Sequence, residues 1–319
     1  MIRFLVGTYV FIWRLITSYF PYGTNIYDRE WELVVVLDSC RIDALQQVAD
    51  EYEFLSEIET ITSVGSTSPE WIDNTFIEEH INDIRSTSYI TANAYSERHV
   101  KKEGVNRLRC AETRGTIYEN SELLHKLIRN DSVGGEFASF KLVEGAKLTN
   151  ADNRQYFHPD LVTARAIQTA RERNPKKMIV HYMQPHAPYI ADAVGRGFYK
   201  EYEERPFKYL KQGGKKSVVW EVYLDNLRLV LDSIEILLNN IDAEDVVITA
   251  DHGELFGEFG LYSHIYGVPH PALKKVPWTK TTAKDKHTTN VEELISDHEI
   301  VENDDNSTES RLAALGYLS

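Results

Sequence analysis

Two runs of apolar residues constrain the fold most. Residues 33–37 read LVVVL and residues 246–250 read VVITA. Runs of this kind are buried on both faces of a strand, which is typical of a parallel sheet covered by helices. Each run stops at an aspartate, Asp38 or Asp251. Open α/β sheets bind their ligands at the carboxyl ends of the strands, so these two carboxylates are candidates for a shared site.

Helical and strand patterns alternate along the rest of the chain. We predict helices at 42–48, 158–173 and 218–241, and strands at 53–61, 87–93 and 177–182. This alternation favours a three-layer α/β/α sandwich with a mostly parallel central sheet. The 319 residues, 42% of them hydrophobic, can bury a large core. Residues 94–153 are less patterned, and we expect them to form a peripheral insertion.

Charge and cysteine content limit the functional classes. Lys and Arg number 35 against 49 Asp and Glu, and the net charge of -14 disfavours a general nucleic-acid binder. The two cysteines, Cys40 and Cys110, provide no disulfide framework, so a reducing compartment and a cytoplasmic location are expected. No histidine lies near Cys40 in the sequence, so a buried structural thiol is expected there rather than a nucleophile.

Residues 1–24 form a separate N-terminal segment, followed by one domain at 25–319. The stretch IRFLVGTYVFIWRLITSYF is apolar, but Arg14 interrupts it and no small-residue cleavage site follows. This pattern disfavours both a membrane span and a signal peptide. It favours an amphipathic helix, which either lies on a membrane surface or packs on the domain.

The residues after the second apolar run have the chemistry of metal ligands. Asp251 and His252 offer an oxygen and a nitrogen side by side, and Gly253 lets the backbone turn away, which would suit a zinc-like or manganese-like ion. The same residues could form a turn whose carboxylate caps the next segment. Asp38 also has two interpretations, because it could cap the helix at 42–48, bind a metal, or do both.

Three hydroxyl residues, Ser66, Thr67 and Ser68, precede Pro69 in the loop at 61–71. Proline favours the first turn of a helix, which we predict at 70–80. The N-terminus of a helix stabilises an anion and lowers the cost of ionising a hydroxyl, so a nucleophile would suit this place. An ordinary helix cap would have the same sequence.

His186 lies between Pro185 and Pro188, after the strand predicted at 177–182. The prolines hold this loop in a stiff, non-helical conformation, which could direct the imidazole at a substrate. The alternative interpretation is a histidine in a surface loop.

These features occur in the order found in the alkaline phosphatase superfamily. They are Asp38, the hydroxyl loop at 65–69, the His-x-Pro-Tyr loop at 186–189 and the segment ADHGELFGEFGLYSH at 250–264. The sequence resembles the sulfatase-like branch, which includes lipoteichoic acid synthases and phosphoethanolamine transferases. The spacing within 250–264 is similar to that of the transferases, and residues 311–318 resemble the end of many sulfatases.

The resemblance implies an alkaline-phosphatase-like fold and a site with one divalent ion. Its ligands would be Asp38, Asp251, His252 and Thr67, with Thr67 also the nucleophile. The loop register leaves Ser66 or Ser68 as the alternative nucleophile. The substrate-binding residues implied are Arg41, Ser66, His186 and His264, and one of the two histidines would protonate the leaving oxygen.

Three departures from the sulfatase pattern disfavour formylglycine chemistry. Ser39 stands where sulfatases usually have a second aspartate, Thr67 replaces the residue that becomes formylglycine, and Trp71 replaces an arginine. We therefore expect a metal-dependent hydrolase of sulfate or phosphate esters, using zinc, manganese, calcium or magnesium. The alternatives are a phosphoryl or phosphoethanolamine-type transferase acting on a glycan or lipid, and a non-catalytic binding homologue. Residues 1–20 could add a peripheral membrane contact.

Overall fold

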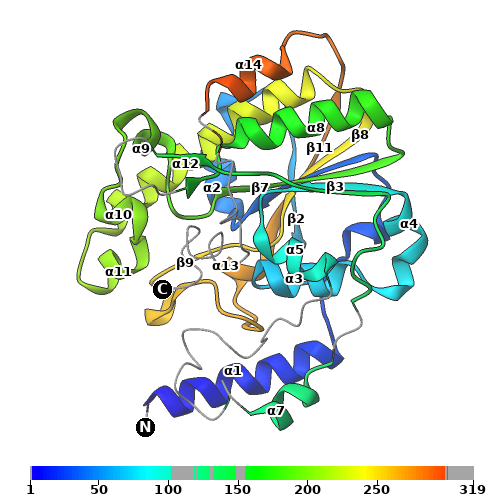
Figure 1. The fold of residues 1–319 in the computed structure, drawn as a ribbon. Coiled ribbons are helices and arrows are strands. Elements are labelled where there is room, and N and C mark those ends of the chain that lie inside the picture. The colour runs from blue at the N-terminus through cyan, green and yellow to red at the C-terminus, as the bar shows by residue number, and fades with distance from the viewer. Residues whose placement is uncertain are drawn as a thin grey trace.

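The computed structural model describes residues 2–101, 118, 121–129, 132–148, 155–298 and 300. Its centre is a seven-stranded sheet with helices on both faces (Figure 1). The strand order is β2-β11-β8-β1-β7-β3-β4. The strands are β1 (Leu33–Asp38), β2 (Ile58–Thr62), β3 (Thr87–Thr91), β4 (Ser139–Leu142), β7 (Lys177–Pro185), β8 (Ala243–Ala250) and β11 (Lys275–Ala283).

The sheet is mostly parallel. β1 pairs in parallel with both β7 and β8, and β3 pairs in parallel with β7 and β4, whereas β11 runs antiparallel to β8 and β2. Every residue of β1 and β7 is buried, which explains why the run at 33–37 is apolar on both faces. The predicted three-layer α/β/α fold with a mostly parallel sheet is confirmed.

Helices form the outer layers (Figure 1). One face is covered by α8 (Pro159–Arg173), α12 (Lys216–Leu238) and α14 (Val291–Ser296), and the other by α3 (Ser68–Thr75), α4 (Ile81–Ser86) and α5 (Ala94–Val100). α8 begins where the predicted helix does, because His158 caps it and Pro159 occupies its first turn. It ends at Asn174, which adopts a left-handed conformation.

Shorter elements complete the described part of the chain. They are α2 (Ile42–Val48), α7 (Glu122–Leu127), α9 (Ala191–Arg196), α10 (Glu201–Glu204), α11 (Pro206–Lys211), α13 (Pro271–Lys274), β5 (Ala146–Lys147), β6 (Gln155–Tyr156), β9 (Leu255–Phe256) and β10 (Tyr262–Ser263). Single 3-10 turns lie at Ile26–Asp28, Ala49–Glu51, Glu78–His80 and Glu258–Gly260.

The structure differs from the sequence prediction in three places. β2 covers only 58–62 of the strand predicted at 53–61, because Leu55 closes a turn onto Tyr52. α3 ends at Thr75 instead of residue 80, since Phe76 leaves the helical conformation. β4, at the end of the predicted insertion, pairs with β3 and so belongs to the main sheet.

The N-terminal segment is a helix, α1 (Ile2–Tyr19), and it packs against the domain. Val10 joins a small apolar cluster with Leu255, Ile265, Val268 and Leu273. The Arg14 guanidinium lies over the Tyr266 ring, and the Thr17 hydroxyl donates to Glu70 Oε1 at 3.1 Å. Among the helices of the described residues, none combines the length and apolar character that a membrane crossing requires.

Candidate active site

Four neighbouring strands bring polar side chains to one edge of the sheet. β8, β1, β7 and β3 are adjacent and parallel, so their carboxyl ends lie together. β1 ends at Asp38, β8 is followed by Asp251 and His252, β7 by His186, and β3 by Asn93. The edge predicted from the sequence to hold a site therefore contains residues that are far apart along the chain.

Asp38, Asp251 and His252 form a buried cluster. One ligand atom from each lies within 4.8 Å of the others, the spacing needed to hold one metal ion. His252 Nε2 is 3.6 Å from Asp38 Oδ1 and 3.4 Å from Asp251 Oδ2. All three side chains are inaccessible to solvent. Buried charges are unfavourable unless they are paired or coordinate a metal, so this cluster requires a compensating group.

Hydrogen bonds fix the two carboxylates. Asp38 accepts from Ser39 Oγ at 3.0 Å, from Ser68 Oγ at 3.1 Å and from Asn93 Nδ2 at 3.0 Å. The Ser39 amide donates to Asp251 Oδ1 at 3.1 Å and thus links the ends of β1 and β8. Asp38 does not cap α2 through its side chain, because the N-cap position is held by Arg41.

The two carboxylates differ in acidity. Burial and the charge of Asp251 raise the pKa of Asp38 well above its usual range. Burial also raises the pKa of Asp251, but His252 and His181 outweigh that effect and hold it below its usual range. Two ionised carboxylates this close repel each other, and a positive charge between them offsets that repulsion.

The tautomer of His252 indicates where that positive charge would lie. Its Nδ1 donates to the carbonyl oxygen of Gly253 at 2.8 Å, so in the neutral ring Nε2 carries a lone pair directed at two carboxylates. Burial lowers the pKa of His252, which favours that neutral ring. Asp251 Oδ2 has no hydrogen-bond partner within the described part of the chain. Lone pairs from both residues thus face a common point, and a divalent cation fits them.

Gly253 is required by the close approach of another backbone segment. A Cβ atom there would lie 2.1 Å from the carbonyl oxygen of Ala272, and the Gly253 amide donates to Leu273 at 2.8 Å. Only glycine lets the chain pass α13 directly after the two metal-ligand candidates.

Comparisons with known proteins found similarity to solved structures. No family model and no curated protein matches the chain. The solved structures similar to it are enzymes of the alkaline phosphatase superfamily.

Three of these structures illustrate the range of sequence identity, coverage and TM-score. The soluble domain of lipooligosaccharide phosphoethanolamine transferase A from Neisseria meningitidis is 13% identical, with 90% of this chain and 86% of that chain covered and a TM-score of 0.47. The integral membrane form of that transferase is 14% identical and has a TM-score of 0.45. The match covers 91% of this chain and 55% of that chain, so this chain spans about half of its length. Phosphonate monoester hydrolase of Agrobacterium radiobacter is 10% identical, with 79% of this chain and 68% of that chain covered and a TM-score of 0.35.

Two further histidines adjoin the cluster. The His264 ring lies 4.6 Å from the His252 ring and 5.2 Å from the His186 ring, measured between centroids. His264 Nδ1 is 3.3 Å from Glu254 Oε2, and the Glu254 side chain is buried. Burial and the two neighbouring histidines lower the pKa of His186 well below its usual range. The structure therefore brings together the histidines and metal-ligand candidates predicted from the sequence.

The three hydroxyl residues have different partners. Thr67, the N-cap of α3, accepts from the Glu70 amide at 3.3 Å. Ser68 Oγ donates to Asp38 and lies 3.2 Å from His252 Nε2. Ser66 Oγ donates to Glu70 Oε2 at 2.6 Å and lies 3.0 Å from the carbonyl oxygen of Ile265. Ser68 is thus the hydroxyl in direct contact with the metal-ligand candidates, whereas Ser66 is engaged with Glu70 and the chain at 265.

Two other predicted residues have structural partners. The Arg41 guanidinium is paired with Asp43 at 2.7 Å and Glu258 at 2.8 Å, and it donates to the Glu254 carbonyl oxygen at 3.0 Å. Cys40 is fully buried, and burial raises the pKa of its thiol, so the expectation of a structural cysteine is confirmed.

Sequence reasoning missed Asn93, Glu254 and His181 as members of the site. Asn93 is the last residue of the strand predicted at 87–93, so its position was a usable signal. Glu254 belongs to the Asp-His-Gly-Glu segment, but its contact with His264 depends on the fold of the following loop. His181 Nε2 lies 3.6 Å from Asp251 Oδ2, although the residue is inside β7 and not at its end.

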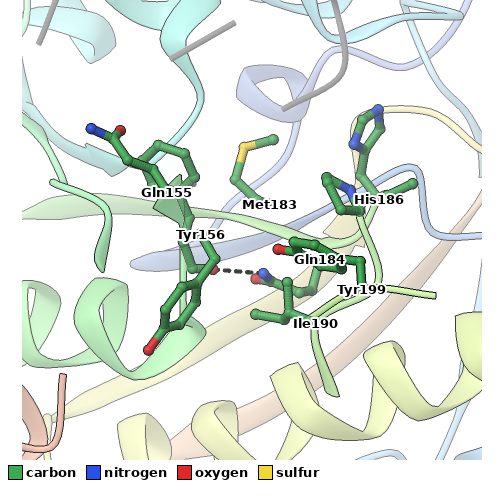
Figure 2. A pocket seen from close by; sticks show the side chains of 10 residues that line it. Gln155, Tyr156, Met183, Gln184, His186, Ile190 and Tyr199 are labelled. Carbon is green, nitrogen blue, oxygen red and sulfur yellow. Dashed lines mark hydrogen bonds between the residues drawn. The ribbon is translucent and has the colours of Figure 1, made fainter. Parts of the chain in front are cut away.

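A pocket opens beside His186. Figure 2 shows Gln184 near its centre, where the side-chain amide donates to the carbonyl oxygen of Phe157 at 2.7 Å. The lining comes from β6, the end of β7 and the following loop: Gln155, Tyr156, Phe157, Met183, Gln184, His186, Ala187, Pro188, Ile190 and Tyr199. Figure 2 shows the His186 imidazole pointing away from Gln184 and Tyr156.

Proposed function

We propose that this chain is a metal-dependent hydrolase of phosphate or sulfate esters. The observation that carries the proposal is the convergence of Asp38, Asp251 and the Nε2 lone pair of His252 on one point. Three ligands of this kind leave further coordination positions for a substrate oxygen and a nucleophile.

Asp38, Asp251 and His252 would hold the ion. A divalent cation there would neutralise charge on the oxygens of a phosphate or sulfate group and favour ionisation of a neighbouring hydroxyl. Asn93 and Ser39 would orient Asp38, and His181 would orient Asp251, because each contacts the carboxylate from outside the cluster.

We infer that Thr67 is the nucleophile and that Ser68 positions Asp38. Thr67 is 5% exposed whereas Ser68 is fully buried, so a substrate reaches Thr67 more readily. The Glu70 amide at the start of α3 already donates to Thr67 Oγ1, and it would stabilise an alkoxide on that atom. Ser68 Oγ donates its proton to Asp38, which suits a residue that fixes the carboxylate.

The reaction begins when the Thr67 hydroxyl gives its proton to a solvent water. Its oxygen then forms a bond to the phosphorus or sulfur atom as the ester bond to the leaving oxygen breaks. His264 protonates that leaving oxygen, since Glu254 holds its Nδ1, while the lowered pKa of His186 leaves that imidazole without the proton near neutral pH. Water then hydrolyses the ester on Thr67 and restores the hydroxyl.

A substrate screen tests the proposal. Purified protein is stripped with a chelator, reconstituted with zinc, manganese, magnesium or calcium, and incubated with aryl sulfates, phosphate monoesters, phosphodiesters and phosphonates. We expect turnover of at least one ester class that depends on added metal. The same preparation of an Asp38→Ala, Asp251→Asn double variant is the control. Absence of turnover with every combination would overturn the proposal.

A transferase is the second candidate, and the outer surface of α1 supports it. Tyr9, Ile12, Ile16 and Tyr19 are each 42–48% exposed, and Phe20 is 76% exposed. An apolar surface of this kind suits contact with a lipid bilayer, where a lipid hydroxyl could replace water as the acceptor. Flotation with anionic vesicles, comparing the full chain with an Ile12→Ser, Phe20→Ser variant, tests this membrane contact. Equal flotation of both proteins would count against it.

A further inference from the structure

A second group of metal-ligating side chains lies outside the Asp38 cluster. His158 and Asp160 are at the start of α8, and His298 follows the end of α14. One ligand atom from each lies within 4.8 Å of the others. The chain supplies these groups from segments about 140 residues apart, so their convergence depends on the tertiary fold.

The three side chains are held in position by further contacts. The rings of His158 and His298 lie 4.4 Å apart, centroid to centroid, and His158 Nδ1 is 3.4 Å from Asp160 Oδ2. Ser233 donates to the other oxygen of Asp160. The Oδ2 atom of Asp160 is therefore the one that faces the imidazoles.

His298 provides the observation that points to a ligand. Its Nδ1 lies 3.2 Å from the hydroxyl of Tyr156, while its Nε2 is buried and has no hydrogen-bond partner among the residues that the structure describes. When Nδ1 donates to the Tyr156 oxygen, Nε2 carries a lone pair. A metal-binding histidine commonly has this arrangement, in which one nitrogen is fixed by an oxygen and the other faces the ion.

We propose that His158, Asp160 and His298 form a second divalent-cation site that accepts zinc. Two imidazoles and one carboxylate are ligands that zinc favours, and three protein ligands leave a fourth position for water. The side chains of His158 and Asp160 are 12% and 23% exposed, so an ion can reach them from solvent. The ion would fasten the segment after α14 to the start of α8.

Tyr156 connects the proposed second site with the pocket beside His186. The Tyr156 hydroxyl contacts His298, and Tyr156 also lines that pocket together with His186 (Figure 2). Fixing His298 with an ion would fix the Tyr156 side chain. Occupancy of this second site would therefore stabilise one wall of the pocket without contributing a group to the Asp38 cluster.

Zinc binding to an Asp38→Ala, Asp251→Asn, His264→Ala variant isolates the second site, because two ligands of the first cluster and one member of the group His186, Glu254 and His264, which could also hold an ion, are then removed. Isothermal titration calorimetry with zinc chloride should show about one equivalent bound. Adding His298→Ala should lower the affinity at least tenfold or abolish binding. Adding His287→Ala instead is the matched control, since this histidine is 75% exposed and lies outside the cluster. It should leave the affinity unchanged.

Thermal unfolding in the same background gives a second measurement. Zinc should raise the Tm of this background variant and of its His287→Ala derivative, but not that of the derivatives carrying His298→Ala or His158→Ala. If the His298→Ala derivative fails to fold, the His158→Ala derivative tests whether the rise in Tm depends on this cluster. Equal zinc affinity with and without His298 or His158 would overturn the proposal. Its failure would leave the proposed hydrolase untouched, since turnover is tested on the other cluster.

Discussion

At the scale of single residues, the metal ligands should be separable from the residues that position them. Asp251→Asn keeps the size of the side chain but removes its charge, so we expect metal affinity at the Asp38 cluster to fall at least tenfold and turnover to be lost. Asn93→Ala removes only a hydrogen bond to Asp38, so it should lower metal affinity and turnover by less. Metal analysis and activity assays of both variants make the comparison. Full metal content in Asp251→Asn would contradict the proposed site.

The two hydroxyls of the loop should respond differently to substitution. Thr67→Ala should abolish turnover, whereas Thr67→Ser should retain part of it because the oxygen is kept. Ser68→Ala should reduce metal affinity and turnover together, since it loosens Asp38. Acid quenching followed by mass spectrometry would locate a phosphorylated or sulfated residue. A label on Ser68 would exchange the roles that we assign to the two residues.

The pair between Arg41 and Glu258 should contribute to pH-dependent stability. Partial burial raises the pKa of Glu258, but Arg41 outweighs that effect and lowers it from 4.5 to about 2. A lowered folded-state pKa means that the contribution is fully present above pH 4.5 and is lost as the pH falls toward 2. Glu258→Gln should therefore destabilise the protein at pH 7 by about 1 kcal/mol and by less at pH 3.

Urea unfolding at both pH values measures that difference. Glu201→Gln is a suitable control, since the Glu201 side chain is 52% exposed and its nearest cation, Lys208 Nζ, is 3.5 Å away. A Glu258→Gln destabilisation that does not shrink on acidification would show that the ion pair with Arg41 is not responsible.

At the scale of secondary-structure elements, α1 has a buried and an exposed side that should behave differently. Val10 is 2% exposed within the cluster around Leu273, whereas Ile16 is 42% exposed. Val10→Ala should lower the free energy of unfolding by about 1 to 2 kcal/mol, and Ile16→Ser should have little effect. Chemical denaturation measures both. Equal effects would mean that α1 does not pack as described.

The sequence predicted the elements whose burial dominates their composition. β1 and β8 are buried over successive residues, so their apolar runs and the acidic residues that end them were recognisable. The limits of β2 and α3 were wrong because they depend on a turn at Leu55 and on the conformation of Phe76, neither of which changes the hydrophobic pattern.

The side-chain contacts of the site were harder to predict than its location. Successive residues at a helix start point in directions about 100° apart, so the sequence alone could not tell that Ser68 contacts Asp38. Thr67 holds the N-cap position of α3, so the ordinary helix cap that the loop sequence also allowed is present at this residue. The pairing of Glu254 with His264 required the loop between them.

At the scale of the whole molecule, the excess of acidic residues should make stability depend on salt. The net charge of -14 produces repulsion between exposed carboxylates, and raising the ionic strength from 0.1 to 1 M shortens the screening length from about 10 to about 3 Å. We expect potassium chloride to raise the Tm by several degrees over that range. Scanning calorimetry would measure the change, with sucrose at equal osmolality as the control. A Tm that falls with salt would contradict this expectation.

The bond between the Ser39 amide and Asp251 Oδ1 joins residues 212 positions apart. During synthesis on the ribosome, the half of the cluster on β1 emerges long before the half on β8. A nascent chain that has not yet paired β8 with β1 lacks the second carboxylate and the imidazole, and it has only a weak hold on an ion. Metal binding at the proposed site would therefore require that β8 has paired with β1, and the order in which the chain is made would disfavour early loading with a wrong metal.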